Sequence, residues 1–202
     1  GEDNIAFCPD SDYAANVELA EALAPATSRA AASKAMEKIA TPGKMACADV
    51  ADYLAVPLEK IVKSIAVISE KEDGSTTFAL LLLRGDHELN AVKAQKLPAV
   101  ASPLRMASAA QVQAISGCEP GFLGPVGLNC PIIADHAALA LADFVCGANR
   151  RDAHLTGVNW ARDLPAPPAA DLRNVVDGDP SPSGQGRLRI VRGIEVGHIF
   201  QL

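Results

Sequence analysis

Two apolar segments separated by a short polar turn constrain the fold more than any other feature of the chain. Residues 61–69 (IVKSIAVIS) and 76–84 (TTFALLLLR) are rich in β-branched and large apolar side chains, which favour strands. The intervening residues 71–75 (KEDGS) have the composition of a turn, so we predict an antiparallel hairpin. The second segment is apolar almost without interruption, which indicates a central strand buried on both faces.

The rest of the chain mixes extended and helical patterns. Strands are predicted at residues 36–40, 104–107, 131–134 and 153–160, and paired strands at 187–200. Helices are predicted at residues 13–24, 46–54, 88–96, 108–115 and 135–145. Ser11 or Asp12 would cap the first helix, and Ser108 the fourth. Because strands and helices interleave without strict β-α-β regularity, we expect an α+β fold with a mixed, largely antiparallel sheet and surrounding helices.

Composition argues against several functional classes. The formal net charge is −6, whereas a protein that grips long nucleic acids unaided is usually basic. The five cysteines are odd in number and include no CxxC, which argues against a disulfide framework and a structural zinc site. No apolar run approaches the ~20 residues that span a bilayer, and GEDNIAF at the N-terminus has no signal-peptide core. We therefore expect a cytoplasmic chain, cut from a longer protein, without DNA or membrane partners.

Three features could carry chemistry, and each also has a purely structural explanation. Lys63 interrupts an apolar strand, where a buried ammonium is costly unless paired, but it can equally occupy the solvent face. The loop GFLGP, residues 121–125, can offer N–H groups to a phosphate or an oxyanion, or be an ordinary turn. His154 is either a binding residue or a structural histidine, and the histidines show no metal-ligand spacing. Cys118 beside Glu119 could be a thiol nucleophile, although no basic neighbour supports it.

Eight segments, in the same order along the chain, resemble the editing insertion of bacterial-type prolyl-tRNA synthetase. They are SDYAANVELAEA (11–22), MEKIATPG (36–43), VKSIAV (62–67), LLLRGDHELNAVK (81–93), GFLGPVGL (121–128), DFVCGAN (143–149), HLTGVNWARD (154–163) and RGIEVGHIFQL (192–202). The resemblance implies one editing domain over residues 1–202, with the fold of the YbaK/ProX-like deacylase superfamily. Its ends, about 1–12 and 187–202, resemble flanking segments of the synthetase's class II catalytic domain.

This resemblance implies post-transfer editing, in which the ester of Ala-tRNA(Pro) is hydrolysed and Pro-tRNA(Pro) is spared. A synthetic pocket built for proline cannot strongly reject alanine, because a missing methylene costs only ~1–3 kcal/mol, so a second pocket excludes proline by size. The implied partners are the acceptor CCA end of tRNA(Pro) charged with alanine and the rest of the synthetase, a homodimer. Editing would need no cofactor, while ATP and Mg would belong to the synthetase's catalytic domain. The fragment itself is not expected to aminoacylate.

The resemblance also implies roles for particular residues. Lys63 would hold the phosphate of the terminal adenosine, and the loop bearing Gly121, Gly124 and Pro125 would orient the ester through its amides. The substrate-binding residues implied are His154, Asp135 and Thr41. Asp135 could also receive the α-ammonium group of the substrate. No side chain is an obvious general base, so the ribose 2′-hydroxyl of the substrate is expected to position the water.

Two related functions stay open at this point. A free-standing deacylase of the same superfamily would act in trans, but such proteins lack the flanking strands that GHIFQL resembles here. A non-catalytic insertion would only stabilise the synthetase or dock tRNA, and Lys63 would then be dispensable. The stretch KMACADV, residues 44–50, departs from the family pattern close to Thr41 and could alter the start of the following helix.

Overall fold

The predicted hairpin forms half of the largest sheet. The computed structural model describes residues 3–193, and its strands β4 (Val62–Glu70) and β5 (Thr76–Arg84) pair antiparallel along their whole length. Strands β6 (Ile132–Asp135) and β9 (Ala169–Ala170) extend the sheet by parallel pairing, in the order β4-β5-β6-β9. The four leucines of β5 are at most 1% exposed, which confirms that this strand is buried on both faces.

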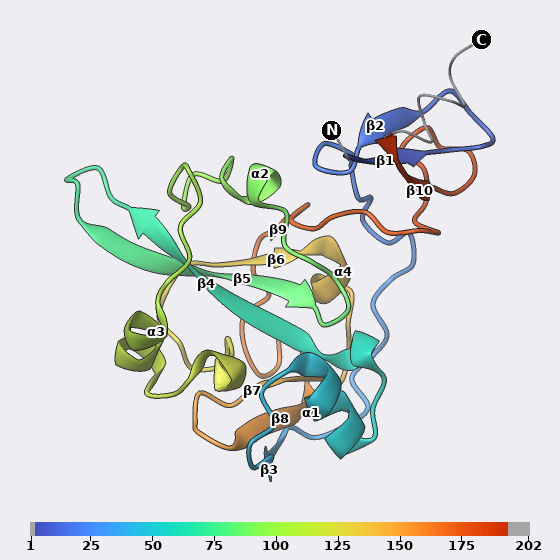
Figure 1. Ribbon diagram of the computed structural model, residues 1–202. Helices are drawn as coiled ribbons and strands as arrows, with labels where there is room; N and C mark the ends of the chain where they lie inside the picture. Colours follow the sequence, from blue (N-terminus) through green and yellow to red (C-terminus); the bar gives the residue numbers. More distant parts are fainter. Residues whose placement is uncertain (1–2, 194–202) are drawn as a thin grey trace.

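A second sheet lies against the beginning of β4. It consists of β3 (Glu37–Ala40), β8 (Ala153–Val158) and β7 (Phe144–Gly147), in that order and antiparallel throughout. The residue before β4, Ile61, forms a parallel bridge with Val145 of β7. In Figure 1 this sheet is drawn below the central one, with β3 at its outer edge. The two sheets therefore meet where β4 begins, next to Lys63.

The helices are short and cover the sheets. They are α1 (Cys47–Leu54), α2 (Ala91–Ala94), α3 (Ala109–Ser116) and α4 (His136–Leu139), with 3-10 turns η1 (Leu58–Lys60) and η2 (Pro120–Phe122). Ser108 forms a capping box with Gln111, which confirms the predicted start of α3. Residues 104–107, predicted as a strand, contribute only an isolated bridge to β4. Along residues 3–193, none of the helices has the length and apolar character needed to cross a bilayer.

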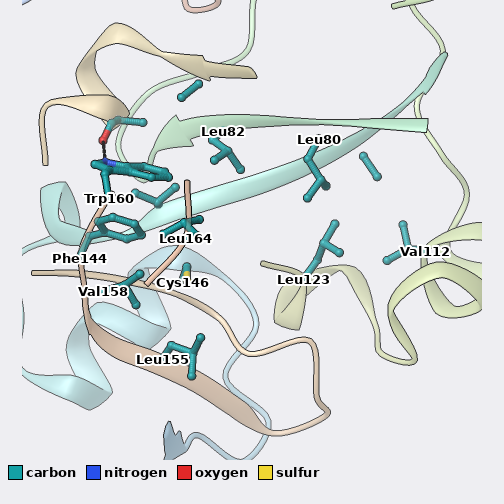
Figure 2. Packing of buried hydrophobic residues seen from close by; sticks show 14 residues of the cluster. Leu80, Leu82, Val112, Leu123, Phe144, Cys146, Leu155, Val158, Trp160 and Leu164 are labelled. Carbon is teal, nitrogen blue, oxygen red and sulfur yellow. Dashed lines mark hydrogen bonds between the residues drawn. The ribbon is translucent and has the colours of Figure 1, made fainter. Parts of the chain in front are cut away.

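The main hydrophobic core fills the space between the two sheets. Figure 2 shows Leu80 and Leu82 of β5 on one side of this cluster and Cys146 and Leu155 of the second sheet on the other. Trp160 closes one end of the cluster, where its indole N–H donates to a backbone carbonyl of α4 at 3.3 Å. The sheets are therefore held by close packing of mostly small and medium side chains, as the low aromatic content of 4% requires.

A third, small sheet is formed by the two ends of the described chain. It contains β1 (Asn4–Phe7), β2 (Ala14–Asn16) and β10 (Arg189–Arg192), in the order β10-β1-β2 and antiparallel. Figure 1 shows this sheet standing apart from the other two, with its own small apolar cluster. A strand within residues 187–200 is confirmed as β10, but its partner is β1, and residues 194–200 lie outside the described residues.

Two predicted helices are wrong, and long-range pairing explains both. Part of segment 13–24 forms β2 instead, because its backbone pairs with β1. In segment 135–145 the helix ends at Leu139, since Asp143 adopts a left-handed backbone (φ 52°) and Phe144 begins a fully buried strand. The Ala- and Leu-rich composition favours helices locally, but propensity differences stay below ~1 kcal/mol per residue and sheet burial outweighs them. The α+β class and the mixed sheet arrangement are confirmed.

Candidate functional site

A small cavity lies where the two larger sheets meet, and Lys63 forms part of its wall. The cavity has a volume of about 60 Å³ and is bounded by the start of α1, the start of β4, η2, the end of β7 and the start of β8. Lys63 is half-buried there, and none of the ion pairs within residues 3–193 includes it. A half-buried ammonium without a counter-ion is unfavourable, so this position suits an anionic group such as a phosphate.

His154 lines the same cavity from β8 and is fixed from behind by Thr41. The Thr41 hydroxyl oxygen and His154 Nδ1 are 2.6 Å apart and share a hydrogen bond, and both side chains are buried. The ring of Phe122 meets the imidazole edge-on, with centroids 5.6 Å apart. Burial lowers the pKa of His154 below its usual value, against a smaller opposing contribution from the Gly121 backbone. The imidazole is therefore neutral at pH 7, so it shapes the cavity rather than adding charge.

The glycines of the 121–125 loop permit close backbone packing. A β-carbon placed on Gly121 would lie 2.5 Å from the β-carbon of Met45, at the mouth of the cavity. A β-carbon on Gly124 would collide with the carbonyl group of Gly147. Asn149 holds the 121–125 loop in place through two hydrogen bonds to Gly124. Its side-chain oxygen accepts from the Gly124 N–H and its side-chain nitrogen donates to the Gly124 carbonyl, both at 2.8 Å. A larger residue at Gly121 would push the loop away from Met45, and one at Gly124 would push it away from β7.

Most of the amides that the loop was predicted to offer are already used within the protein. The Phe122 N–H donates to a carbonyl at 3.0 Å, the Leu123 N–H to another at 3.2 Å, and the Gly124 N–H to Asn149. The Gly121 N–H finds no acceptor among residues 3–193, and Gly121 lines the cavity. Pro125 lines a separate surface hollow. Gly121 is therefore the member of the loop whose N–H is left for a ligand, and its role in binding stays a prediction.

Asp135, predicted to line the pocket, does not border the Lys63 cavity. Its two carboxylate oxygens accept hydrogen bonds from the N–H groups of Ala137 and Leu172, each at 2.9 Å. The guanidinium of Arg173 lies 3.8 Å from one of these oxygens. Burial raises the pKa of Asp135 above its usual value, against the opposing effect of these hydrogen bonds. This geometry favours a structural role for Asp135, and its role in substrate binding stays a prediction.

Sequence reasoning did not single out several residues that line the cavity. Ser64 follows Lys63 directly, and Gly147 lies in the DFVCGAN segment, so both were near a recognised signal. Met45 and Cys47 belong to the stretch that departs from the family pattern. Met45 and Cys47 are far from β4 in sequence, so the pattern could not predict that they line the same cavity. That arrangement depends on the packing of α1 beside the start of β4.

The cysteine thiols at and near the cavity are not activated as nucleophiles. Cys118, the candidate thiol nucleophile, is buried and does not border the cavity, and burial raises the pKa of its thiol. Burial also raises the pKa of the Cys47 thiol, against the opposing charge of Lys63. Thiols with raised pKa values are poor nucleophiles. Across residues 3–193, no three His, Cys, Asp or Glu side chains lie close enough together to hold a metal ion.

Comparisons with known proteins agree with this architecture. Residues 41–164, more than half of the chain, match the family model of the aminoacyl-tRNA editing domain. All of this chain aligns with 35% of a proline–tRNA ligase from Dechloromonas aromatica at 64% identity, and with 35% of one from Ralstonia pickettii at 56% identity. The chain thus spans about a third of the length of these curated relatives.

A solved structure described provisionally as a trans-editing enzyme for prolyl tRNA synthetase shares the fold. Its TM-score is 0.57 at 24% identity, and the match covers 69% of this chain and 87% of that one.

The segment that matches the family model runs from Thr41 to beyond His154, so it contains all the predicted site residues. The chain belongs to the aminoacyl-tRNA editing domain family.

Proposed function

We propose that this chain hydrolyses the ester of alanine wrongly attached to a proline tRNA and spares the prolyl ester. The observation that carries the proposal is the half-buried, unpaired Lys63 at a cavity of about 60 Å³ that Gly121 also lines, with its N–H unbonded among residues 3–193. A cation and an N–H donor on one compartment suit the phosphate and the ester carbonyl of an aminoacylated RNA end.

The size of the cavity supports a preference for a small side chain. Its volume is only about 60 Å³, which favours a methyl group over a prolyl ring. His154 forms one wall. Its hydrogen bond to Thr41 and its edge contact with Phe122 hold the imidazole in place. A second pocket that excludes proline by size requires such a rigid, uncharged wall.

Each group has a separate part in the proposed reaction. Lys63 holds the phosphate of the terminal nucleotide, and the Gly121 N–H donates to the ester carbonyl oxygen. His154 is neutral and its Nδ1 is engaged with Thr41, so it is poorly placed as the general base at that nitrogen. The ribose 2′-hydroxyl of the substrate then positions the water, and the protein contributes orientation and electrostatics.

The proposed partners follow from charge and from the length of the relatives. With a net charge of −6, the chain binds only the acceptor CCA end, while the rest of a homodimeric proline–tRNA ligase holds the tRNA body. ATP and Mg serve aminoacylation in that larger protein and are not needed for editing. The similarity to a trans-editing structure keeps a free-standing activity as the second candidate, which equal rates of hydrolysis by this chain alone and by the whole ligase would favour.

The test compares hydrolysis of Ala-tRNA(Pro) and Pro-tRNA(Pro) by the wild type, Lys63→Ala and Lys71→Ala. Lys71 is a matched control, because it is exposed in the turn at the far end of the same hairpin. Loss of a charged hydrogen bond worth about 1.5–3 kcal/mol should lower kcat/KM of Lys63→Ala roughly 10- to 100-fold. Full activity of Lys63→Ala would contradict the proposed phosphate site, and equal rates on the two esters would contradict the sieve.

A further inference from the structure

The hydroxyl of Ser64 is an unpaired polar group at the cavity. Its oxygen is shielded from solvent and forms no hydrogen bond with any described residue, and Ser64 lines the cavity beside Lys63. A buried hydroxyl without a partner destabilises a fold, and alanine at the same position would avoid that cost. Buried polar groups are nearly always satisfied in native proteins, so an exception inside a candidate site indicates a ligand that satisfies it.

The pleat of β4 places the Ser64 side chain on the strand face that packs toward the loop bearing Gly121. In the pleat of β4, Ser64 shares a face with Ala66, which packs in the main core with Leu123. Leu123 and Gly121 both line the cavity. Among the described residues that line the cavity, none carries a carboxylate, and one of them is Lys63. The compartment therefore favours negative charge that develops on a bound group.

We propose that Ser64 is a catalytic residue whose O–H stabilises the oxyanion of the ester together with the Gly121 N–H. This inference rests on the proposed deacylase function. When the water oxygen attacks the ester carbonyl carbon, an electron pair moves onto the carbonyl oxygen, which accepts both hydrogen bonds. Collapse of the intermediate restores the carbonyl and breaks the acyl C–O bond to the ribose. The proton lost by the attacking water passes to the departing ribose oxygen, and Ser64 keeps its own.

A nucleophilic role for Ser64 does not fit its surroundings. A serine nucleophile needs a base within hydrogen-bond reach, and no group in the described chain bonds to this hydroxyl. The neighbouring Lys63 ammonium is a donor only, and His154 Nδ1 is engaged with Thr41. A donor to the oxyanion needs no base, because it keeps its proton throughout.

The test uses Ser64→Ala, Ser64→Thr and the matched control Ser69→Ala in this chain and in the proline–tRNA ligase that would contain it. Ser69 is a buried serine of the same strand, at its far end from the cavity. Single-turnover hydrolysis of Ala-tRNA(Pro) at rising enzyme concentration gives the rate constant at saturation and the half-saturation concentration. Thermal unfolding of each variant is measured in parallel.

Removal of one oxyanion donor predicts a loss of about 100-fold in the saturating rate constant of Ser64→Ala, with little change in half-saturation. Its unfolding midpoint should equal or exceed that of the wild type, because an unpaired hydroxyl has been removed. Ser64→Thr should restore most of the rate, and Ser69→Ala should keep it.

Different results would overturn different claims. A Ser64→Ala rate within about 3-fold of the wild type would show that the hydroxyl is not a donor, while the editing function would stand. A slow Ser64→Ala variant with a strongly lowered unfolding midpoint would assign Ser64 a structural role, and an acyl-enzyme seen by mass spectrometry would make it a nucleophile. Wild type that is inactive in both proteins would overturn the proposed function together with this inference.

Discussion

Asp135→Ala would remove two buried hydrogen bonds at once, and the structure allows the cost to be worked out. The Ala137 N–H would lose the cap of α4, which costs about 0.5–2 kcal/mol. The N–H of the fully buried Leu172 would be left unpaired, at about 1–3 kcal/mol. Arg173 keeps its two hydrogen bonds to Asp179, at 2.8 and 2.9 Å, and adds little to the loss. The sum is a fall of roughly 1.5–5 kcal/mol in the free energy of unfolding.

Urea unfolding of the wild type, Asp135→Ala and Asp135→Ser measures this fall. Serine can still cap α4, but its single oxygen cannot serve both amides, so Asp135→Ser should lie between the other two proteins. Deacylation of Ala-tRNA(Pro) per folded molecule should stay close to the wild-type rate, because Asp135 does not border the cavity. A variant within about 0.5 kcal/mol of wild-type stability that has lost deacylation would refute this reasoning and establish Asp135 as a substrate ligand.

Two other perturbations test the cavity wall and a buried histidine. His154→Ala should widen the cavity so that Pro-tRNA(Pro) is hydrolysed beside Ala-tRNA(Pro); unchanged selectivity between the two esters would contradict the size sieve. Burial, with the charges of Arg173 and Arg84, lowers the pKa of His87 from 6.5 to about 4. As the pH falls from 6.5 to about 4, the imidazole of His87 is protonated in the unfolded chain before it is protonated in the folded one. The free energy of unfolding should therefore fall by up to about 3 kcal/mol over this pH range. Urea unfolding at both ends of the window should show a smaller fall for His87→Gln, and an equal fall would exclude His87 as the cause.

The sequence by itself determines the elements whose signals are local. The apolar runs around KEDGS produce the β4–β5 hairpin, and Ser108 with Gln111 produces the capping box of α3. In both cases the residues that interact are close in sequence or follow a simple period, so pattern alone predicts them. The resemblance carried by short segments likewise identified Lys63, Gly121 and His154, which the fold brings to one cavity.

Tertiary structure alone decided the features that depend on distant partners. The segment Ala14–Asn16 became a strand because β1 was available to pair with it, and α4 stopped early because β7 is buried beside β8. Thr41 meets His154 across 113 residues of sequence, and the amide of Leu172, 37 residues away, binds one carboxylate oxygen of Asp135. The physical reason is one of magnitude: local propensities amount to tenths of a kcal/mol per residue, whereas burial and unpaired polar groups amount to whole kcal/mol.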